Sequence, residues 1–315
     1  MTSTMNEPDK NPLIAISDAL AAVVQRVGES TIAVRGRRRG VASGVVWRPG
    51  VVVTVAHAFR RAPAAVSLVA ENGRGMDAAL VGIDSTTDIA VFRLSDESLA
   101  SVEVGDAATI KAGHLAIAIG RGSAGDLTAS YGLVNRTGGA WQTWLGGHID
   151  RLIRLDGGVY DGLSGGPVAD ASGSVIGIAT SALSRSYGIV VPTSTVARVV
   201  DALLTKGHIA RAFLGIGAQP VPLPSTGDEA AAGGDSKVGL LITSLASGGP
   251  ADQAGVLIGD ILVSAAGYPT PSLDQVRNAL ADHIGKEVRV DMVRGGLPAE
   301  ARIMVGEWPT QRHCS

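Results

Sequence analysis

Short apolar runs, built mostly from valine, isoleucine and alanine, recur from residue 31 to residue 191 between glycine, proline and polar residues. β-Branched residues favour extended backbone, and short runs bounded by turn residues are typical of strands. Glycine supplies 42 of the 315 residues, well above its usual share of about 7%, so tight turns are frequent. Many short strands with turns between them predict a β-barrel or a β-sandwich. The expected strands are 31–34, 44–47, 51–54, 64–69, 78–82, 89–94, 115–119, 130–135, 151–155, 175–179 and 188–191.

Changes in periodicity and composition divide the chain into parts. Apolar residues recur at helical spacing over 13–27 and over 193–206, and Gly207 suits the end of the second helix. The stretch 219–237 is rich in Pro, Gly, Ala, Ser and Asp, which predicts a flexible loop. Beyond it we expect strands at 238–245, 260–265, 288–293 and 300–305, and a helix at 272–283. The predicted parts are a tail and amphipathic helix (1–29), a β domain (30–207), an α+β domain (208–306) and a C-terminal tail (307–315).

Charge and cysteine content exclude several classes of protein. The net charge is −2, and the basic block Arg37-Arg38-Arg39 is interpreted as a solvated strand edge, so nucleic-acid binding is not expected. A single cysteine, Cys314, provides neither a disulfide framework nor a thiolate-based metal site. No apolar run reaches the ~18 residues that a membrane span requires. Glu7 and Asp9 precede the first apolar stretch, where a secretory signal would carry positive charge, so no signal peptide is expected.

The stretch Asp161-Gly162-Leu163-Ser164-Gly165-Gly166-Pro167 places a serine among glycines. Glycine allows a tight turn that a Cβ atom would obstruct. Such a turn can expose the hydroxyl group and direct the N–H groups of Gly162 and Ser164 to one point, where a tetrahedral intermediate would carry negative charge. Taken alone, a glycine-rich hairpin loop with an incidental serine explains the stretch equally well.

A nucleophilic serine needs a base, and an imidazole base needs an orienting carboxylate. Among the six histidines, His57 directly follows an apolar strand-like run, and Asp88 directly precedes another. A lone histidine there is more often structural, and Asp84 or Asp88 alone is more often a turn or cap residue. However, the order His, Asp, Ser is one of the known chain orders of the catalytic triad. The three together are therefore candidate catalytic residues.

Several motifs together resemble the HtrA (DegP/DegS-like) family of trypsin-like serine proteases. Those that resemble the three catalytic signatures are Thr54-Val55-Ala56-His57, Asp88-Ile89-Ala90-Val91 and Gly162-Leu163-Ser164-Gly165-Gly166-Pro167. Ala42-Ser43-Gly44-Val45 is similar to the strand before the family's histidine, and residues 187–192 are similar to the end of its protease domain. Residues 210–216 resemble the entry into a PDZ domain, and 248–262 resemble the PDZ core motif. The resemblance covers about residues 14–306.

The resemblance implies a mainly β chain, in which a trypsin-like protease domain with two six-stranded barrels precedes one small α+β PDZ domain. It makes Ser164 the nucleophile, His57 the general base and Asp88 its orienting carboxylate. The backbone N–H groups of Gly162 and Ser164 would form the oxyanion hole. PDZ domains bind peptide C-termini by strand addition, and Phe213-Leu214-Gly215-Ile216 would supply the carboxylate loop and the edge. The alternative for this segment is an ordinary buried strand.

The chain departs from the family pattern at three places. Leu163 replaces the usual Asn before the serine, and we expect activity to survive because that side chain points away from the chemistry in relatives. Arg121-Gly122 stands where the family has Asn-Pro. The resemblance implies a homotrimer, but the aromatic residues that join many family trimers are absent before Trp47.

The residue six positions before the serine lies at the base of the primary specificity pocket in trypsin-like proteases. Here it is Gly158, with Gly157 and Val159 beside it. Since no charge is available there for a lysine or arginine side chain, we predict cleavage after small or medium apolar residues such as Val or Ala.

Two hypotheses of function follow. The first is an ATP-independent serine endopeptidase of unfolded or damaged proteins, which a PDZ domain recruits or gates; no phosphate-binding loop motif is present. The second is a catalytically silent, chaperone-like pseudoprotease that binds peptides. Cys314 and the scattered histidines do not support a cysteine- or metal-dependent hydrolase, so we expect no cofactor and no metal. The expected location is cytoplasmic for the chain as written, and the bacterial envelope if its N-terminus is truncated or misassigned.

Overall fold

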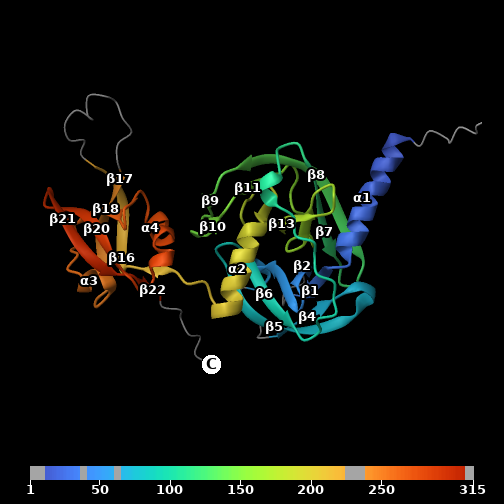
Figure 1. The fold of residues 1–315 in the computed structure, drawn as a ribbon, viewed down its shortest axis with the longest axis horizontal. Helices are drawn as coiled ribbons and strands as arrows, with labels where there is room; N and C mark the ends of the chain where they lie inside the picture. The colour runs from blue at the N-terminus through green and yellow to red at the C-terminus, as the bar shows by residue number, and fades with distance from the viewer. Residues whose placement is uncertain (1–10, 36–40, 60–64, 224–237, 309–315) are drawn as a thin grey trace, which may run out of the picture. The chain divides into compact units, whose positions relative to one another are not determined.

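The computed structural model describes residues 11–35, 41–59, 65–223 and 238–308 (Figure 1). The chain forms two compact units, residues 1–209 and 210–315, each of which has its own apolar core. Among the described residues, no helix has the length and apolarity needed to cross a membrane.

The first unit begins with helix α1 (Pro12–Gly28), followed by a closed six-stranded barrel in the order β1-β2-β3-β6-β5-β4. Neighbouring strands are antiparallel. β3, with the sequence Val-Val-Val-Thr-Val, is buried along its whole length. The strands are β1 (Thr31–Arg35), β2 (Val41–Arg48), β3 (Val51–Val55), β4 (Ala65–Val69), β5 (Gly75–Asp84) and β6 (Ile89–Leu94); the short helices η1 (Ala56–Phe59) and η2 (Glu71–Gly73) lie between them.

The second closed barrel has the strand order β11-β14-β13-β12-β7-β8. Its strands are β7 (Leu115–Arg121), β8 (Leu127–Gly138), β11 (Leu152–Leu155), β12 (Pro167–Ala169), β13 (Val175–Thr180) and β14 (Ile189–Pro192). A two-stranded hairpin, β9 (Trp141–Gln142) and β10 (His148–Ile149), lies outside the barrel, and η3 (Ala107–Thr109) precedes it. These two barrels confirm the predicted mainly β fold with a double barrel.

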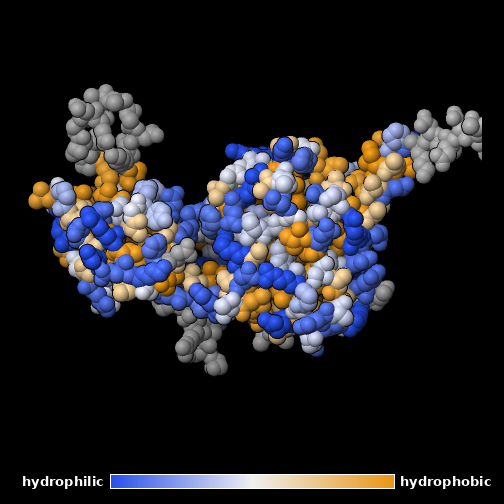
Figure 2. All heavy atoms as spheres, viewed as in Figure 1, coloured by the Kyte–Doolittle hydropathy of each residue, from blue (hydrophilic) through white to orange (hydrophobic). Residues whose placement is uncertain are grey.

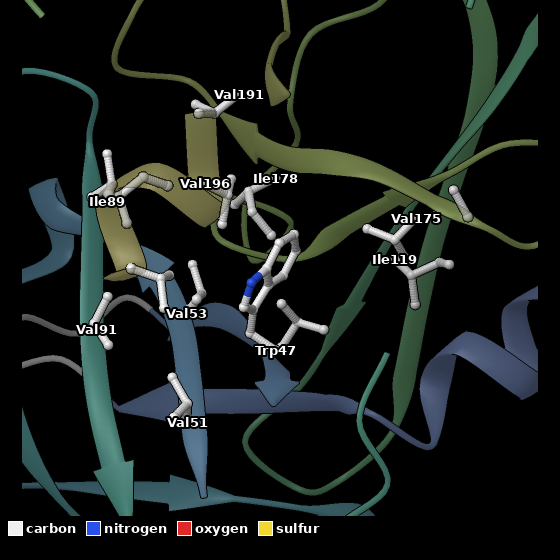
Figure 3. Packing of buried hydrophobic residues seen from close by; sticks show 14 of the residues in the cluster. Trp47, Val51, Val53, Ile89, Val91, Ile119, Val175, Ile178, Val191 and Val196 are labelled. Carbon is white, nitrogen blue, oxygen red and sulfur yellow. The ribbon is translucent and has the colours of Figure 1, made fainter. Parts of the chain in front are cut away.

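One apolar cluster joins the two barrels (Figure 3). Trp47 from the first barrel is 4% exposed and belongs to the same cluster as Ile119 and Ile178 from the second. Helix α2 (Thr193–Lys206) adds the buried face predicted from its spacing and ends at Gly207, whose φ of +74° suits glycine. Because burying one large aliphatic side chain stabilises a fold by roughly 1.5–3 kcal/mol, this shared core fixes the barrels against each other.

Helix α1 is attached to the barrels by its second half. Val23 and Val27 are buried in the shared core, whereas Leu13, Ile14 and Ile16 are 74%, 58% and 52% exposed. Figure 2 shows apolar atoms on the exposed surface of the first half of α1.

The second unit is a sheet with the strand order β16-β17-β18-β20-β21. It comprises β16 (Ile216–Pro222), β17 (Val238–Leu245), β18 (Ile261–Ala265), β20 (Glu287–Arg294) and β21 (Leu297–Met304). β19 (Tyr268–Pro269) pairs with β18, and β15 (Ala212–Phe213) pairs with β22 (Gly306–Glu307). The helices are α3 (Pro250–Gln253), α4 (Leu273–Ala279) and η5 (Ala281–His283).

The predicted loop at 219–237 begins too early. Residues 219–222 continue β16 and pair with residues 238–241 of β17. Proline lacks an N–H group, and β16 is the last strand of the sheet, so Pro220 and Pro222 interrupt no second ladder. Residue 223 follows the strand, and residues 224–237 of the predicted loop lie outside the described residues.

Candidate active site

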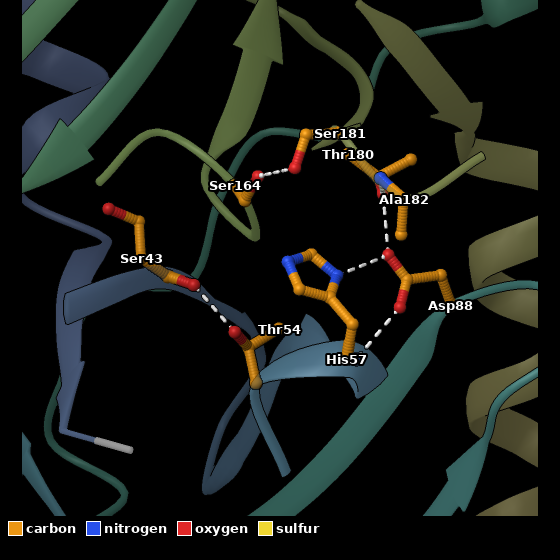
Figure 4. A network of polar contacts seen from close by, with 8 residues as sticks. All are labelled: Ser43, Thr54, His57, Asp88, Ser164, Thr180, Ser181 and Ala182. Carbon is orange, nitrogen blue, oxygen red and sulfur yellow. Dashed lines mark hydrogen bonds and ion pairs between the residues drawn. The ribbon is translucent and has the colours of Figure 1, made fainter. Parts of the chain in front are cut away.

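His57 and Asp88 lie at the same end of two paired strands of the first barrel. β3 pairs with β6 so that Val55 faces Ile89, which places His57 in η1 beside Asp88 just before β6. The His57 ring atom Nδ1 lies 2.8 Å from Asp88 Oδ2, and the His57 backbone N–H donates to Asp88 Oδ1 at 2.9 Å (Figure 4). The Ala56 N–H donates to the Asp88 carbonyl at 3.0 Å. The segment that carries the imidazole is therefore bonded to the carboxylate and to the backbone carbonyl of Asp88.

Asp88 is 3% exposed and has a φ of +61°, in the left-handed region that non-glycine residues rarely adopt. Holding such a conformation costs about 1–2 kcal/mol, and aspartate tolerates it better than most residues. The surrounding hydrogen bonds offset this cost. The hydroxyl of Thr180 also donates to Asp88 Oδ2 and accepts the Ala182 N–H at 3.0 Å. Since Thr180 ends β13, the carboxylate is bonded from both barrels; sequence reasoning missed this residue because no local motif marks it.

Ser164 lies in the turn between the described strands β11 and β12. Gly162 and Gly165 have φ angles of +86° and +88°. A Cβ atom at Gly165 would lie 2.1 Å from the Ser43 carbonyl oxygen, and one at Gly166 would lie 2.0 Å from the Ile119 oxygen. The glycines around the serine are thus required by conformation and by close approach to β2 and β7.

Leu163, which replaces the family's Asn, is 3% exposed and belongs to the apolar cluster inside the second barrel. Its side chain points away from the site, as expected. Apolar burial therefore anchors the serine turn at Leu163.

The backbone N–H groups of Gly162 and Ser164, like that of Asp161, have no hydrogen-bond acceptor in the part of the chain that the structure describes. The other three N–H groups between Gly162 and Gly166 are paired. Leu163 N–H donates to the Tyr160 oxygen at 3.0 Å, Gly165 N–H to the Ala179 oxygen at 2.8 Å and Gly166 N–H to the Leu163 oxygen at 3.0 Å. Unpaired donors beside a serine hydroxyl can accept an oxyanion as a ligand.

The Ser164 hydroxyl forms a hydrogen bond with the Ser181 hydroxyl, at 3.0 Å, rather than with His57. In Figure 4 the second ring nitrogen of His57, Nε2, is on the side of the ring away from Asp88, the side on which Ser164 lies. The structure therefore brings the three predicted catalytic side chains into one site, with the serine hydroxyl turned to a second serine. Sequence reasoning did not identify Ser181.

The predicted specificity residues lie next to the start of β14. Gly188 N–H donates to the Gly157 oxygen at 3.0 Å, and a Cβ atom at Gly188 would lie 3.1 Å from Val159 Cγ2. Val159 is half-buried and packs against the apolar cluster of the second barrel, whereas Gly158 is exposed. No Cβ atom and no charge stands at positions 157 and 158, and the neighbouring side chain is apolar.

The predicted peptide-binding segment of the second unit divides between two strands. Phe213 pairs with Gly306 in the β15–β22 ladder, and Ile216 begins β16. Leu214 is 3% exposed and Gly215 has a φ of +73°. The carbonyls of Leu214 and Gly215 accept from Ala251 and Ala246, but their N–H groups have no acceptor among the described residues. Within the described sheet β16 pairs with β17 alone, so its other edge is open.

Family models match both units: a trypsin-like peptidase domain matches residues 42–178 and a PDZ domain matches residues 241–294. A relative in Synechocystis sp., the putative serine protease HhoB, is 30% identical over 285 residues, which cover 87% of this chain and 68% of the relative. The chain belongs to the HtrA family of trypsin-like serine proteases. It carries a PDZ domain, as the sequence predicted.

Other relatives of this HtrA-family chain are longer. The probable periplasmic serine endoprotease DegP-like of Chlamydia trachomatis is 31% identical over 277 residues, covering 85% of this chain and 54% of that protein. Its counterpart in Brucella suis is 34% identical, covering 88% and 55%. The chain therefore spans about half the length of these two relatives.

Solved structures share the fold. The HtrA-type protease AlgW with a decapeptide has a TM-score of 0.75 at 22% identity, covering 92% of this chain and 99% of that one. The serine endoprotease from Yersinia pestis gives 0.73 at 23%, covering 92% and 98%. Across the described ranges no group of three or more His, Cys, Asp or Glu residues could hold a metal ion.

Proposed function

We propose that this chain is a serine endopeptidase that works through an acyl-enzyme, with Ser164 as nucleophile, His57 as general base and Asp88 as the orienting carboxylate. The observation that carries the proposal is the pairing of His57 Nδ1 with the buried Asp88 carboxylate at 2.8 Å. This bond leaves Nε2 as the nitrogen that can take a proton, because the carboxylate accepts the N–H of Nδ1.

In the first step Ser164 Oγ leaves Ser181, donates its hydrogen to His57 Nε2 and attacks the carbonyl carbon of the scissile peptide bond. Nε2 takes the proton, and Asp88 stabilises the resulting imidazolium. The carbonyl oxygen becomes negative and accepts hydrogen bonds from the Gly162 and Ser164 N–H groups, each contributing on the order of 3 kcal/mol. The imidazolium then protonates the leaving amine as the C–N bond breaks. Water repeats the sequence on the acyl-enzyme and restores the serine.

A fluorophosphonate probe tests this proposal directly, since it labels only an activated serine. The wild-type chain should be labelled, and Ser164→Ala should not. Absence of label on the folded wild-type chain, with and without an apolar C-terminal peptide, would favour the alternative of a catalytically silent, peptide-binding pseudoprotease.

We propose that the substrate residue before the cleaved bond is small or medium and apolar. Support comes from Gly158 and Val159: the first adds no side chain, and the second is apolar and lies beside Gly188. A peptide-library digest should show cleavage mainly after Val or Ala. Dominant cleavage after Lys or Arg contradicts this preference.

We further propose that the protease domain is 30–207 and the PDZ domain 208–306, and that the latter binds peptide C-termini to recruit or gate. The unpaired N–H groups of Leu214 and Gly215 support a carboxylate site, and the open edge of β16 supports strand addition. A fluorescent peptide with a free C-terminal carboxylate should bind, and the same peptide with an amidated C-terminus should bind much more weakly. Equal binding of the two peptides would exclude carboxylate capture.

Unfolded or damaged proteins are the proposed substrates, cut without ATP. The DegP-like relatives are named as periplasmic, so we propose the bacterial envelope as the site of action. Cell fractionation of a strain that expresses the complete natural protein tests this location. Recovery in the cytoplasmic fraction alone overturns it.

A further inference from the structure

One residue outside the predicted triad, Ser43 in β2, binds both Gly162 and Ser164, whose N–H groups are the proposed oxyanion-hole donors. Its backbone N–H donates to the Ser164 carbonyl at 2.9 Å. Its hydroxyl donates to the Gly162 carbonyl at 2.6 Å. Ser43 thus bonds the carbonyl oxygens of Gly162 and Ser164, while their N–H groups have no acceptor among the described residues.

Ser43 is itself fixed on every polar atom. Its hydroxyl oxygen accepts the Arg121 N–H at 2.9 Å, so the one hydroxyl hydrogen is left for Gly162. The Thr54 hydroxyl donates to the Ser43 carbonyl at 2.6 Å. Ser43 is 0% exposed, and a side chain at Gly120 would come within 2.8 Å of its hydroxyl. Water cannot replace these bonds without disturbing the packing of β2 and β7.

The need for such a residue follows from the backbone of Gly162. Its φ of +86° suits glycine, but glycine also leaves any one conformation most easily because it lacks a Cβ atom. Rotation around Gly162 would move its N–H away from the Ser164 N–H and separate the two donors. The hydrogen bond on the Gly162 carbonyl fixes the peptide plane between Gly162 and Leu163, so that only the preceding plane, which carries the Gly162 N–H, is left to rotate about Gly162. Leu163 anchors only the next residue.

We infer that Ser43 is a positioning residue for catalysis, which holds the Gly162 and Ser164 N–H groups aimed at one point. The inference rests on the proposed function, because it assigns those two groups to the oxyanion hole. Ser43 touches neither the substrate nor the reacting atoms. It acts by fixing the donors before charge develops, which is the condition under which such donors stabilise a transition state most.

The test compares three variants in the full chain. Ser43→Ala removes the hydroxyl, and Ser43→Cys keeps a side chain of similar shape with a weaker donor. Thr195→Val is the matched control, since Thr195 is also 0% exposed and its hydroxyl also bonds a backbone group, accepting the Asp150 N–H at 3.0 Å. Loss of about one oxyanion-hole donor predicts a fall in kcat of about 100-fold for Ser43→Ala, with an intermediate value for Ser43→Cys.

A positioning role and a purely structural role of Ser43 predict different affinities for a peptide aldehyde and for the product peptide. A peptide aldehyde, whose adduct with Ser164 carries the oxyanion, should lose affinity for Ser43→Ala by the same factor as kcat. The product peptide, which bears no such group, should bind as it does to the wild type, and KM should change little. Thr195→Val should keep both affinities and kcat.

Hydrogen exchange of the turn peptide provides a measurement that is independent of activity. Amides of residues 160–166 should exchange faster in Ser43→Ala, or in Ser43→Cys if the alanine variant does not fold, and not in Thr195→Val. An unlabelled wild-type chain would refute the proposed protease function, yet exchange would still decide the role of Ser43. Wild-type kcat, aldehyde affinity and exchange in a folded Ser43→Ala or Ser43→Cys variant would overturn the inference.

Discussion

The two units of this chain each bury an aspartate, and the two carboxylates have different partners. Asp260, just before β18, is 2% exposed and accepts two hydrogen bonds from Arg294, at 2.8 and 2.7 Å, and one from the Leu257 N–H at 2.8 Å. The hydrogen bond from Arg294 holds the pKa of Asp260 below its usual value, although burial opposes this shift. Asp88, 3% exposed, is bonded instead to an imidazole and a hydroxyl.

The difference lies in whether the partner can change its charge. Arg294 carries a permanent cation, so its pair with Asp260 can only hold parts of the second unit together. Imidazole gains and loses a proton near neutral pH, so the same carboxylate chemistry beside His57 can support proton transfer. A buried carboxylate is therefore informative about function only when its partner is known.

The largest expected effect comes from Asp88→Asn. The amide keeps the size of the side chain but does not stabilise the imidazolium, so kcat should fall about 10⁴-fold. The free energy of unfolding should change much less than the activation free energy of the reaction. Ester hydrolysis measures kcat, and thermal unfolding measures stability. Retention of more than a tenth of wild-type kcat would remove the distinction between the two aspartates.

Asp260→Asn should lower stability and leave activity unchanged. It removes charge-assisted hydrogen bonds from a buried position and should destabilise the second unit by about 2 kcal/mol, without removing any catalytic group. Asp291→Asn is the matched control, because Asp291 also pairs with an arginine but its side chain is 44% exposed. Denaturant unfolding of the full chain gives both values. Equal effects of the two substitutions would mean that burial of Asp260 adds nothing.

The sequence allowed the catalytic candidates to be predicted because each lies in a short local motif beside a strand. His57, Asp88 and Ser164 were all named from such motifs. The supporting partners could not be found in this way. Thr180 is 92 residues from Asp88, and Ser43 is 119 residues from Gly162, and only the closed barrels bring them together. Nothing next to Thr180 or Ser43 in the chain specifies which carbonyl or carboxylate it will bind.

The same limit applies to the fold. Periodicity predicted long apolar strands such as β6, and helix α2, with accurate ends. It missed β12, which has only three residues and is defined by pairing with β7 and β13. Composition, in turn, assigned residues 219–222 to a loop, since proline opposes strand formation unless the strand lies at an edge. Edge position is a property of the sheet and not of the segment.

A smaller effect is expected from Thr180→Val, which leaves Asp88 with His57 as its side-chain partner. One hydrogen bond to a carboxylate contributes about 1.5–3 kcal/mol, so kcat/KM should fall about 10- to 150-fold, mainly in kcat. The steady-state constants of the isosteric variant measure this effect. Thr180→Ser, which restores a hydroxyl, should recover most of the loss. Wild-type constants for Thr180→Val would show that the ring and the backbone N–H of His57 suffice to position the carboxylate.

The smallest effect concerns acid stability and tests the Arg294 pair again. Because the folded pKa of Asp260 is lowered, the folded state holds this carboxylate charged at pH values where the unfolded chain, with a pKa of about 3.9, binds a proton. The pair therefore stabilises the second unit fully above about pH 4, and this contribution is lost as the pH falls through the folded pKa. The pKa of Asp291 is also lowered, mainly by the Ser264 hydroxyl, so its charge contributes to stability over the same pH range. The contribution of Asp260 is therefore obtained from the difference in Tm between the wild type and Asp260→Asn. Calorimetry of the full chain between pH 5 and pH 3 should show that the Tm gap between the wild type and Asp260→Asn narrows with acid. A gap that stays constant over this range would mean that Asp260 stabilises the unit by packing and not by its charge.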